Sequence, residues 1–214
     1  MKPKALLFDL DGVLIDSERQ YTRIWADVDR IVYHTGVKDF PLAIKGMTLA
    51  NILATYFPEN MHKRVSDFCI AEERKLRFGY MPGARELLAE LKRREIPAVL
   101  VTSSDLAKMN RLQEVLPDIF QWFSHIVYGE MVEHGKPAPD PYLLGAGLSG
   151  VPASDCAVIE DSLSGLESGR AAGAYLIGMT DTLGRKAIEG HADIVLDSLE
   201  DLDLDLLLNT LENR

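Results

Sequence analysis

The feature that most limits how this chain can fold is a series of short apolar runs, each ending abruptly in polar or small residues. The runs contain three or four residues and show no alternation of apolar and polar side chains. Strands this short and this continuously apolar are typical of a parallel sheet that is covered on both faces. We therefore expect buried parallel strands at residues 5–8, 98–101, 157–159, 175–177 and 194–196.

Stretches with helical patterning separate most of these runs. An alternation of strands and helices predicts an α/β fold with a doubly wound, Rossmann-like parallel sheet. The expected helices of this core are residues 84–94, 106–115, 141–148, 163–172 and 199–211.

The segment between the first two expected strands breaks the alternation. It contains no convincing strand, and Pro41 and Pro58 act as helix start signals within it. Helices are expected there at residues 18–33, 42–56 and 61–78. We therefore predict an inserted α-helical cap of residues 17–79, and an α/β core made of residues 1–16 and 80–214.

The composition excludes several classes of protein. With 33 acidic and 23 basic residues the chain has a formal net charge of −10, so it repels nucleic acid and anionic membranes. Its apolar runs are too short to cross a bilayer, and Asp9 and Asp11 interrupt the first of them, so we expect no export signal. The histidines and cysteines match no metal-binding spacing. We expect a cytoplasmic protein that is a monomer or a weak homodimer.

Four carboxylates follow expected strand ends. Asp9 and Asp11 come after the first strand, and Glu160 and Asp161 come after another. Open α/β sheets place ligands at the carboxyl edge, so these groups meet in one crevice if the two strands are neighbours. Like charges about 4 Å apart repel by roughly 4 kcal/mol at the effective dielectric of a protein surface. Such a cluster needs a cation or protonation to be tolerated, and oxygen donors alone favour Mg²⁺ as the cation.

Two further sites offer groups that bind anions. Thr102 and Ser103 stand at a strand end, where a helix begins, and Lys136 lies in a turn rich in proline. The plainer alternatives are helix capping by Ser104 or Asp105 and a lysine that is merely solvated. Glycines at 165, 169 and 173 recur every four residues and predict close packing of a helix on the sheet.

Taken together, these motifs resemble the four-motif set of the haloacid dehalogenase superfamily, and the match spans nearly the whole chain. The residues that carry it are 9–13, Thr102, Lys136 and 160–161. The inserted helices, the Gly-Lys-Pro-Ala-Pro-Asp segment 135–140 and the Ile-Glu-Asp-Ser segment 159–162 are similar to the β-phosphoglucomutase-like branch with its small cap.

The resemblance implies how the four carboxylates are used. Asp9 would attack phosphorus and form an aspartyl-phosphate, and Asp11 would serve as general acid and then general base. Mg²⁺ would be held by the carboxylates of Asp9 and Asp161 and the backbone carbonyl of Asp11, with Glu160 ligating directly or through water. Thr102, the amide of Ser103 and Lys136 would hold the phosphoryl oxygens.

The expected reaction is hydrolysis of a small phosphorylated metabolite, with sugar phosphates as the first candidates. A mutase is the alternative, but mutases of this branch carry a histidine where Tyr21 stands and a phosphate-gripping arginine where Leu49 stands. A binding module without catalysis is the third possibility. In the cap, Tyr21 and Lys45 are candidates to face the substrate, together with Met47 and Thr48, unless they are cap core or solvated surface.

Overall fold

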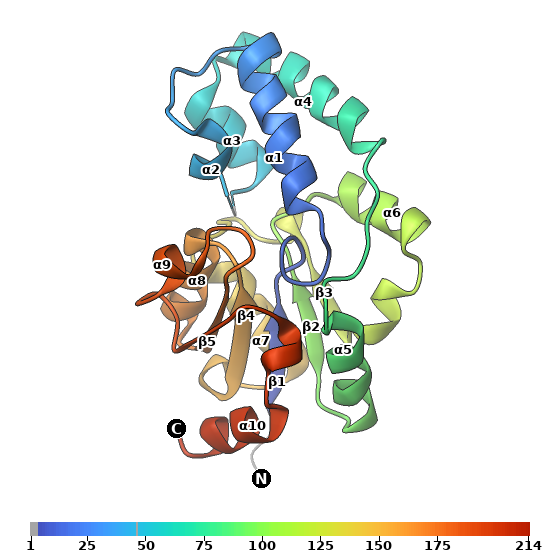
Figure 1. Cartoon of the computed structure of the whole chain (residues 1–214), viewed down its shortest axis with the longest axis vertical. Helices are drawn as coiled ribbons and strands as arrows, with labels where there is room; N and C mark the ends of the chain where they lie inside the picture. Colours follow the sequence, from blue (N-terminus) through green and yellow to red (C-terminus); the bar gives the residue numbers. More distant parts are fainter. Residues whose placement is uncertain (1–3, 46) are drawn as a thin grey trace.

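A six-stranded parallel sheet organises the computed structural model of this chain, which describes residues 4–45 and 47–214 (Figure 1). The strand order is β3-β2-β1-β4-β5-β6. This confirms the predicted doubly wound α/β core, although residues 1–3 of the predicted core and Gly46 of the predicted cap lie outside the described ranges. The strands are β1 (Ala5–Phe8), β2 (Ala98–Val101), β3 (His125–Val127), β4 (Cys156–Glu160), β5 (Tyr175–Met179) and β6 (Ile194–Leu196).

Helices cover both faces of the sheet because successive strand residues point to opposite sides. Leu6 and Phe8 of β1 pack in one buried cluster with α5, α6 and α10, whereas Ala5 and Leu7 pack in another with α7 and α8. The continuous apolar runs are thus explained by burial on two sides. The core helices are α5 (Ala84–Arg93), α6 (Leu106–Val115), α7 (Asp140–Ser149), α8 (Leu163–Ala172), α9 (Arg185–Ile188) and α10 (Leu204–Glu212).

The strand order reverses direction between β1 and β4, which pair in parallel with Phe8 opposite Ile159. The chain moves from β1 to β2 and β3 on one side, and from β4 to β5 and β6 on the other. In doubly wound sheets the crevice outside the carboxyl ends at such a reversal binds the ligand. The residues that directly follow Phe8 and Ile159 therefore stand where a ligand is expected.

Helices inserted after β1 form a second layer above that edge of the sheet (Figure 1). They pack around their own hydrophobic cluster, in which the ring of Phe40 makes edge contacts with Trp25, Tyr56 and Phe57. The chain leaves and re-enters the core through two adjacent segments joined by an antiparallel bridge between Ile15 and Tyr80. The cap helices are α1 (Glu18–Asp27), extended by a π-helical turn (Val28–Val32), α2 (Phe40–Ala43), α3 (Leu49–Tyr56) and α4 (Glu59–Glu73).

Four expectations about secondary structure were wrong. The helix expected at residues 61–78 begins at Glu59 and ends at Glu73. The edge strand β3 escaped prediction because its residues are partly exposed and form no apolar run. The predicted helix 42–56 is two helices, because the Thr48 hydroxyl accepts a hydrogen bond from the Asn51 amide and starts a new helix. The predicted helix 199–211 is a short 3₁₀ turn followed by α10, which the Asp203 carboxylate caps at Leu206.

None of the helices in the described ranges combines the length and apolar character that crossing a bilayer requires.

Candidate active site

Three buried carboxylates converge at the point where the strand order reverses. Asp9 follows β1, Glu160 ends β4 and Asp161 comes next, and each offers an oxygen within 4.8 Å of the others. The exposed fractions are 8% for Asp9, 1% for Glu160 and 3% for Asp161. The predicted meeting of the two acidic motifs is therefore present in the fold.

Lys136 lies between two of these carboxylates, at only 1% exposure. Its ammonium group donates to Asp9 Oδ1 and to Glu160 Oε1, both at 2.6 Å, and to the carbonyl of Val101 at 3.1 Å. Burial opposes a charged lysine, but the two carboxylates outweigh burial and raise its pKa well above the usual value. Lys136 therefore remains a cation and partly neutralises the cluster.

Glu160 is held from several directions at once. Its Oε1 also accepts from the Tyr142 hydroxyl at 3.0 Å, and its Oε2 accepts from the amides of Asp161 and Ser162 and from the Ser162 hydroxyl, at 2.9 to 3.0 Å. Burial would raise its pKa, but Lys136 and the bonds from Ser162 lower it below the ordinary value. Both oxygens of Glu160 are thus already committed to protein donors.

Asp9 and Asp161 have fewer positive charges and hydrogen-bond donors around them than Glu160 has. Burial raises the pKa of Asp9 to about 7, against the effect of Lys136, and Glu160 and Asp11 add to the rise. Burial also raises the pKa of Asp161 well above its usual range, and the charges of Glu160 and Asp9 add to this, although the Thr182 hydroxyl donates to it. These two groups are held close together without enough positive charge to keep both ionised.

The donor set fits a divalent cation. With all three carboxylates ionised, the one ammonium group of Lys136 leaves an excess of two negative charges in a buried site. The ligand atoms on offer are oxygens, which Mg²⁺ prefers. Because Glu160 is already saturated with donors, Asp9 and Asp161 are the carboxylates best able to reach an ion.

Gly12 has a positive φ of 76° and lets the loop after β1 approach Asp161. A Cβ atom there would come within 2.0 Å of Asp161 Oδ2. A side chain at this position would therefore displace a carboxylate of the cluster, which explains the glycine directly after Asp11.

Asp11 points to different partners from those of Asp9. Its Oδ1 accepts from the Ser17 hydroxyl, and its Oδ2 accepts from the Ser104 hydroxyl at 3.2 Å and from the ammonium group of Lys108. Burial would raise the pKa of Asp11, but Lys108 and these hydroxyl donors lower it below its usual value. In this arrangement Asp11 is an ionised carboxylate, the form that accepts a proton.

The segment after β2 combines a helix cap with two contacts to Asp11. Asp105 is the N-cap of α6 and accepts from the Lys108 amide at 2.8 Å, which places the Lys108 side chain in the first turn, facing Asp11. Ser104 does not cap the helix, because its hydroxyl donates to Asp11. Thr102, whose hydroxyl accepts from the Ser104 amide at 3.1 Å, and Ser103 line the same pocket as Asp9.

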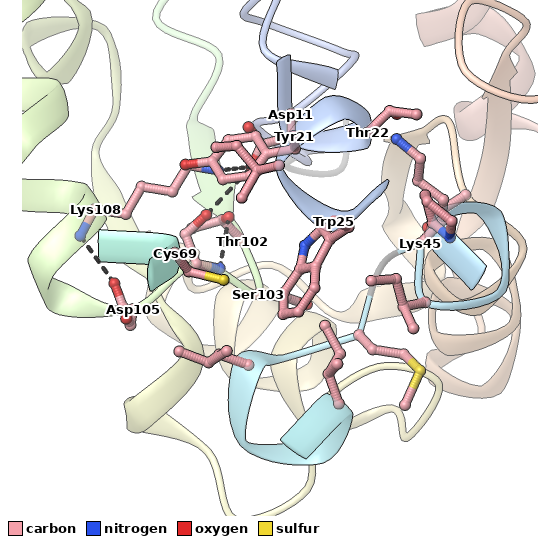
Figure 2. A pocket seen from close by; sticks show the side chains of 18 of the residues that line it. Asp11, Tyr21, Thr22, Trp25, Lys45, Cys69, Thr102, Ser103, Asp105 and Lys108 are labelled. Carbon is pink, nitrogen blue, oxygen red and sulfur yellow. Dashed lines mark hydrogen bonds and ion pairs between the residues drawn. The ribbon is translucent and has the colours of Figure 1, made fainter. Parts of the chain in front are cut away.

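A pocket of about 130 Å³ lies between these groups and the cap (Figure 2). Tyr21 and Lys45, the cap candidates for substrate contact, line it, and so does Met47. Thr48 does not, because it caps α3. The remaining lining from the cap is mainly apolar and includes Ile24, Trp25, Ile44, Leu49, Ile52 and Cys69.

Several pocket residues were not anticipated from the sequence. Lys108 approaches Asp11 and also places its ammonium group 3.8 Å from the centre of the Tyr21 ring (Figure 2). Glu73, at the end of α4, lines the pocket from the cap. The spacing of Lys108 from the N-cap Asp105 could have indicated its role, whereas the sequence holds no signal for Glu73.

The glycines of α8 serve three different purposes. Gly169 packs against the sheet as expected, since a Cβ there would lie 2.8 Å from Leu176 Cδ2. Gly165 instead makes room for a carboxylate, because its Cβ would lie 1.7 Å from Glu160 Oε1. Gly173 was wrongly assigned to packing: it is the left-handed C-cap of α8, with φ 85° and open space around it.

We predict that Gly165→Ala lowers the free energy of unfolding by about 1–3 kcal/mol and sharply reduces activity, since Glu160 has to move away from Lys136. The matched control is Gly147→Ala in α7, where a Cβ meets no atom within 4 Å and alanine should be neutral or slightly stabilising. Urea denaturation and turnover of both variants test this. Equal stability and equal turnover of the two variants would show that Gly165 is not needed to keep Glu160 in place.

Comparison with known proteins gives consistent matches. Residues 3–173 match the family model of haloacid dehalogenase-like hydrolases. The chain is 34% identical to a Drosophila melanogaster protein named probable pseudouridine-5′-phosphatase, over 91% of this chain and 89% of that protein. It is 32% identical to hexitol phosphatase A of Escherichia coli, over 94% of each. The crystal structure of β-phosphoglucomutase from Clostridium difficile superposes with a TM-score of 0.80 at 22% identity, covering 99% of this chain and 98% of that one, which is a likeness of fold.

Proposed function

Since this chain belongs to the haloacid dehalogenase-like hydrolases, we propose that it is a Mg²⁺-dependent phosphatase of small phosphomonoesters, such as sugar phosphates, that forms an aspartyl-phosphate on Asp9. One observation carries the proposal: a buried aspartate at the reversal of the strand order, next to Asp161 and Lys136, lines a pocket whose other wall is formed by the cap. The names of the two phosphatase relatives agree with this activity.

The first step uses Asp9 as the nucleophile. A carboxylate oxygen of Asp9 attacks phosphorus, the bond from phosphorus to the ester oxygen breaks, and the leaving alkoxide takes a proton from Asp11. In the second step water attacks the phosphorus of the acyl phosphate, gives its proton to Asp11 and frees Asp9 and inorganic phosphate. Asp11 thus begins and ends the cycle protonated.

The contacts of Asp11 are matched to the second step. Lys108, Ser17 and Ser104 stabilise its ionised form, which is the form that accepts a proton from water. To act as an acid, Asp11 has to leave Lys108 and face the leaving group with a proton. Arrival of the substrate and movement of the cap are the events that change these contacts.

The phosphoryl group is held by residues at the strand ends. Thr102 and the amide of Ser103 donate to its oxygens, and Lys136 neutralises charge next to Asp9. Asp9 and Asp161 would hold Mg²⁺, together with the backbone carbonyl of Asp11. When bound, Mg²⁺ offsets the repulsion between an anionic nucleophile and an anionic phosphate.

The cap favours hydrolysis over the mutase alternative. Leu49 lines the pocket at the position where the mutase pattern carries an arginine, and an apolar side chain cannot grip a second phosphate. The fold itself does not distinguish the two, since the chain superposes on a β-phosphoglucomutase.

We predict phosphate release from p-nitrophenyl phosphate and from sugar phosphates that needs Mg²⁺, stops with EDTA and returns when Mg²⁺ is restored. The measurement is phosphate release across a panel of phosphomonoesters, with and without the ion. Glucose 1-phosphate tests the mutase alternative. Conversion mainly to glucose 6-phosphate, with little free phosphate, would show that the enzyme is a mutase and not a phosphatase. No turnover of any ester would favour a binding module.

A further inference from the structure

Glu73 is a carboxylate of the catalytic pocket that takes no part in the chemistry above. It is the last residue of α4, is partly buried, and lines the same pocket as Asp9. An acidic side chain at the C-terminal end of a helix is unfavourable for the helix dipole, so local structure does not explain it.

Among the described residues, Glu73 makes no ion pair within 4.0 Å. The cation that influences it most is Lys108, whose ammonium group is already paired with Asp11 and stacked on the Tyr21 ring. The buried Tyr21 hydroxyl lies beside Glu73 and favours its ionised form, yet it is not aligned for a full hydrogen bond to a described residue. Both groups therefore have hydrogen-bonding capacity to spare.

Glu73 is partly removed from water, and few positive charges or hydrogen-bond donors compensate for the lost hydration. Burial raises the pKa of Glu73 to about 7, against the opposing effect of Lys108. A partly buried carboxylate with few hydrogen-bond donors is unfavourable, and a ligand that brings donors relieves the penalty. A hydroxyl group of the ligand can donate a hydrogen bond to Glu73 without bringing a second positive charge next to Lys108.

The rest of the pocket limits what else the ligand carries. Trp25, Ile44 and Leu49 present an apolar wall, which suits the C–H face of a carbon skeleton. A second phosphate or a carboxylate would meet the negative charge of Glu73 instead of a free cation. The other pocket lysine is Lys45. Burial lowers its pKa, and the nearby charges of Asp161 and Asp11 oppose this effect. Lys45 therefore lies on the phosphoryl side of the pocket.

We infer that Glu73 determines specificity by accepting a hydroxyl group of the leaving alcohol, so that the preferred substrates are phosphate monoesters of neutral polyols. The inference rests on the proposed phosphatase activity and deepens it. Bisphosphates, and esters whose leaving group is anionic, are then poorer substrates than a polyol monophosphate of equal size.

The test compares sorbitol 6-phosphate, whose leaving group is a polyol, with p-nitrophenyl phosphate, whose leaving group has no hydroxyl donor. We expect Glu73→Leu to lower the kcat/KM for sorbitol 6-phosphate, divided by that for p-nitrophenyl phosphate, by at least about tenfold. This is the usual effect of losing a hydrogen bond to a charged group. Glu73→Gln, which keeps an acceptor oxygen, should recover part of the ratio. Thermal unfolding of each variant checks that the cap remains folded.

The matched control is Glu72→Gln, on the same helix end, where the carboxylate pairs with Lys75 and does not line the pocket. It should leave the ratio within about twofold of the wild type. An equally unchanged ratio in Glu73→Leu would overturn the inference, as would ethanolamine phosphate or a sugar bisphosphate being the best wild-type substrate. If the wild type hydrolysed no ester at all, the proposed function itself would fail.

Discussion

Replacing Asp9 by asparagine is expected to reduce turnover of every phosphomonoester by at least about 10⁴-fold while the protein stays folded. A carboxamide is a very weak nucleophile, so no phosphorylated enzyme forms. The amide oxygen still accepts from Lys136, which donates to Asp9 Oδ1 at 2.6 Å. The substitution also removes one of three crowded carboxylates, so stability should not fall strongly.

Asp16→Asn is the matched control for this change. Asp16 lies in the same loop after β1, is exposed, and holds the cap entry through its amide, which donates to the carbonyl of Gly79 at 3.0 Å. Steady-state turnover, circular dichroism and mass spectrometry of the quenched enzyme should be compared for both variants. Substantial turnover in Asp9→Asn, or a wild-type phosphoryl group on another residue, would rule out Asp9 as the nucleophile.

The sequence predicted the central parts of the sheet and of the site for one physical reason. Strands buried on both faces must be apolar throughout, so β1, β2 and β4 stand out, and whatever follows them lies at the ligand-binding edge. Asp9 and Asp161 could be placed together because their positions depend on backbone topology alone. The edge strand β3, half exposed, gave no comparable signal.

The residues that were missed depend on packing between elements. Lys108 reaches Asp11 from the first turn of α6, and Thr182 reaches Asp161 from a loop after β5. Glu73 enters the pocket because of how the cap lies over the core. No periodicity or motif spacing encodes such approaches, which follow from the relative orientation of helices and loops.

Lys136→Met is expected to lower the free energy of unfolding by about 3–5 kcal/mol near neutral pH, in addition to abolishing activity. Lys136 is 1% exposed and donates to Asp9 and Glu160 at 2.6 Å each. Methionine fills the volume but leaves two buried carboxylates without their cation. Lys63→Met is the control, since that lysine is exposed and its pair with Asp67 should contribute less than about 1 kcal/mol.

The pH dependence separates this explanation from a packing defect. Lys136 lowers the pKa of both Asp9 and Glu160, so its removal raises both values in the folded protein. The unfolded chain releases these protons above about pH 4, while the folded variant retains them. The loss of unfolding free energy in Lys136→Met, relative to the wild type, should therefore be small at low pH and grow as the pH rises. It should level off once the pH exceeds the raised pKa values of Asp9 and Glu160.

Urea denaturation of the wild type, Lys136→Met and the double variant Lys136→Met with Asp9→Asn measures the effect directly. The double variant has one unpaired carboxylate fewer and should be more stable than Lys136→Met alone, with a coupling energy above about 1 kcal/mol. A deficit that is independent of pH and unaffected by Asp9→Asn would mean that lost packing, not unpaired charge, destabilises the variant. Lys136 would then be a filler of the core and not the cation that allows the acidic cluster to exist.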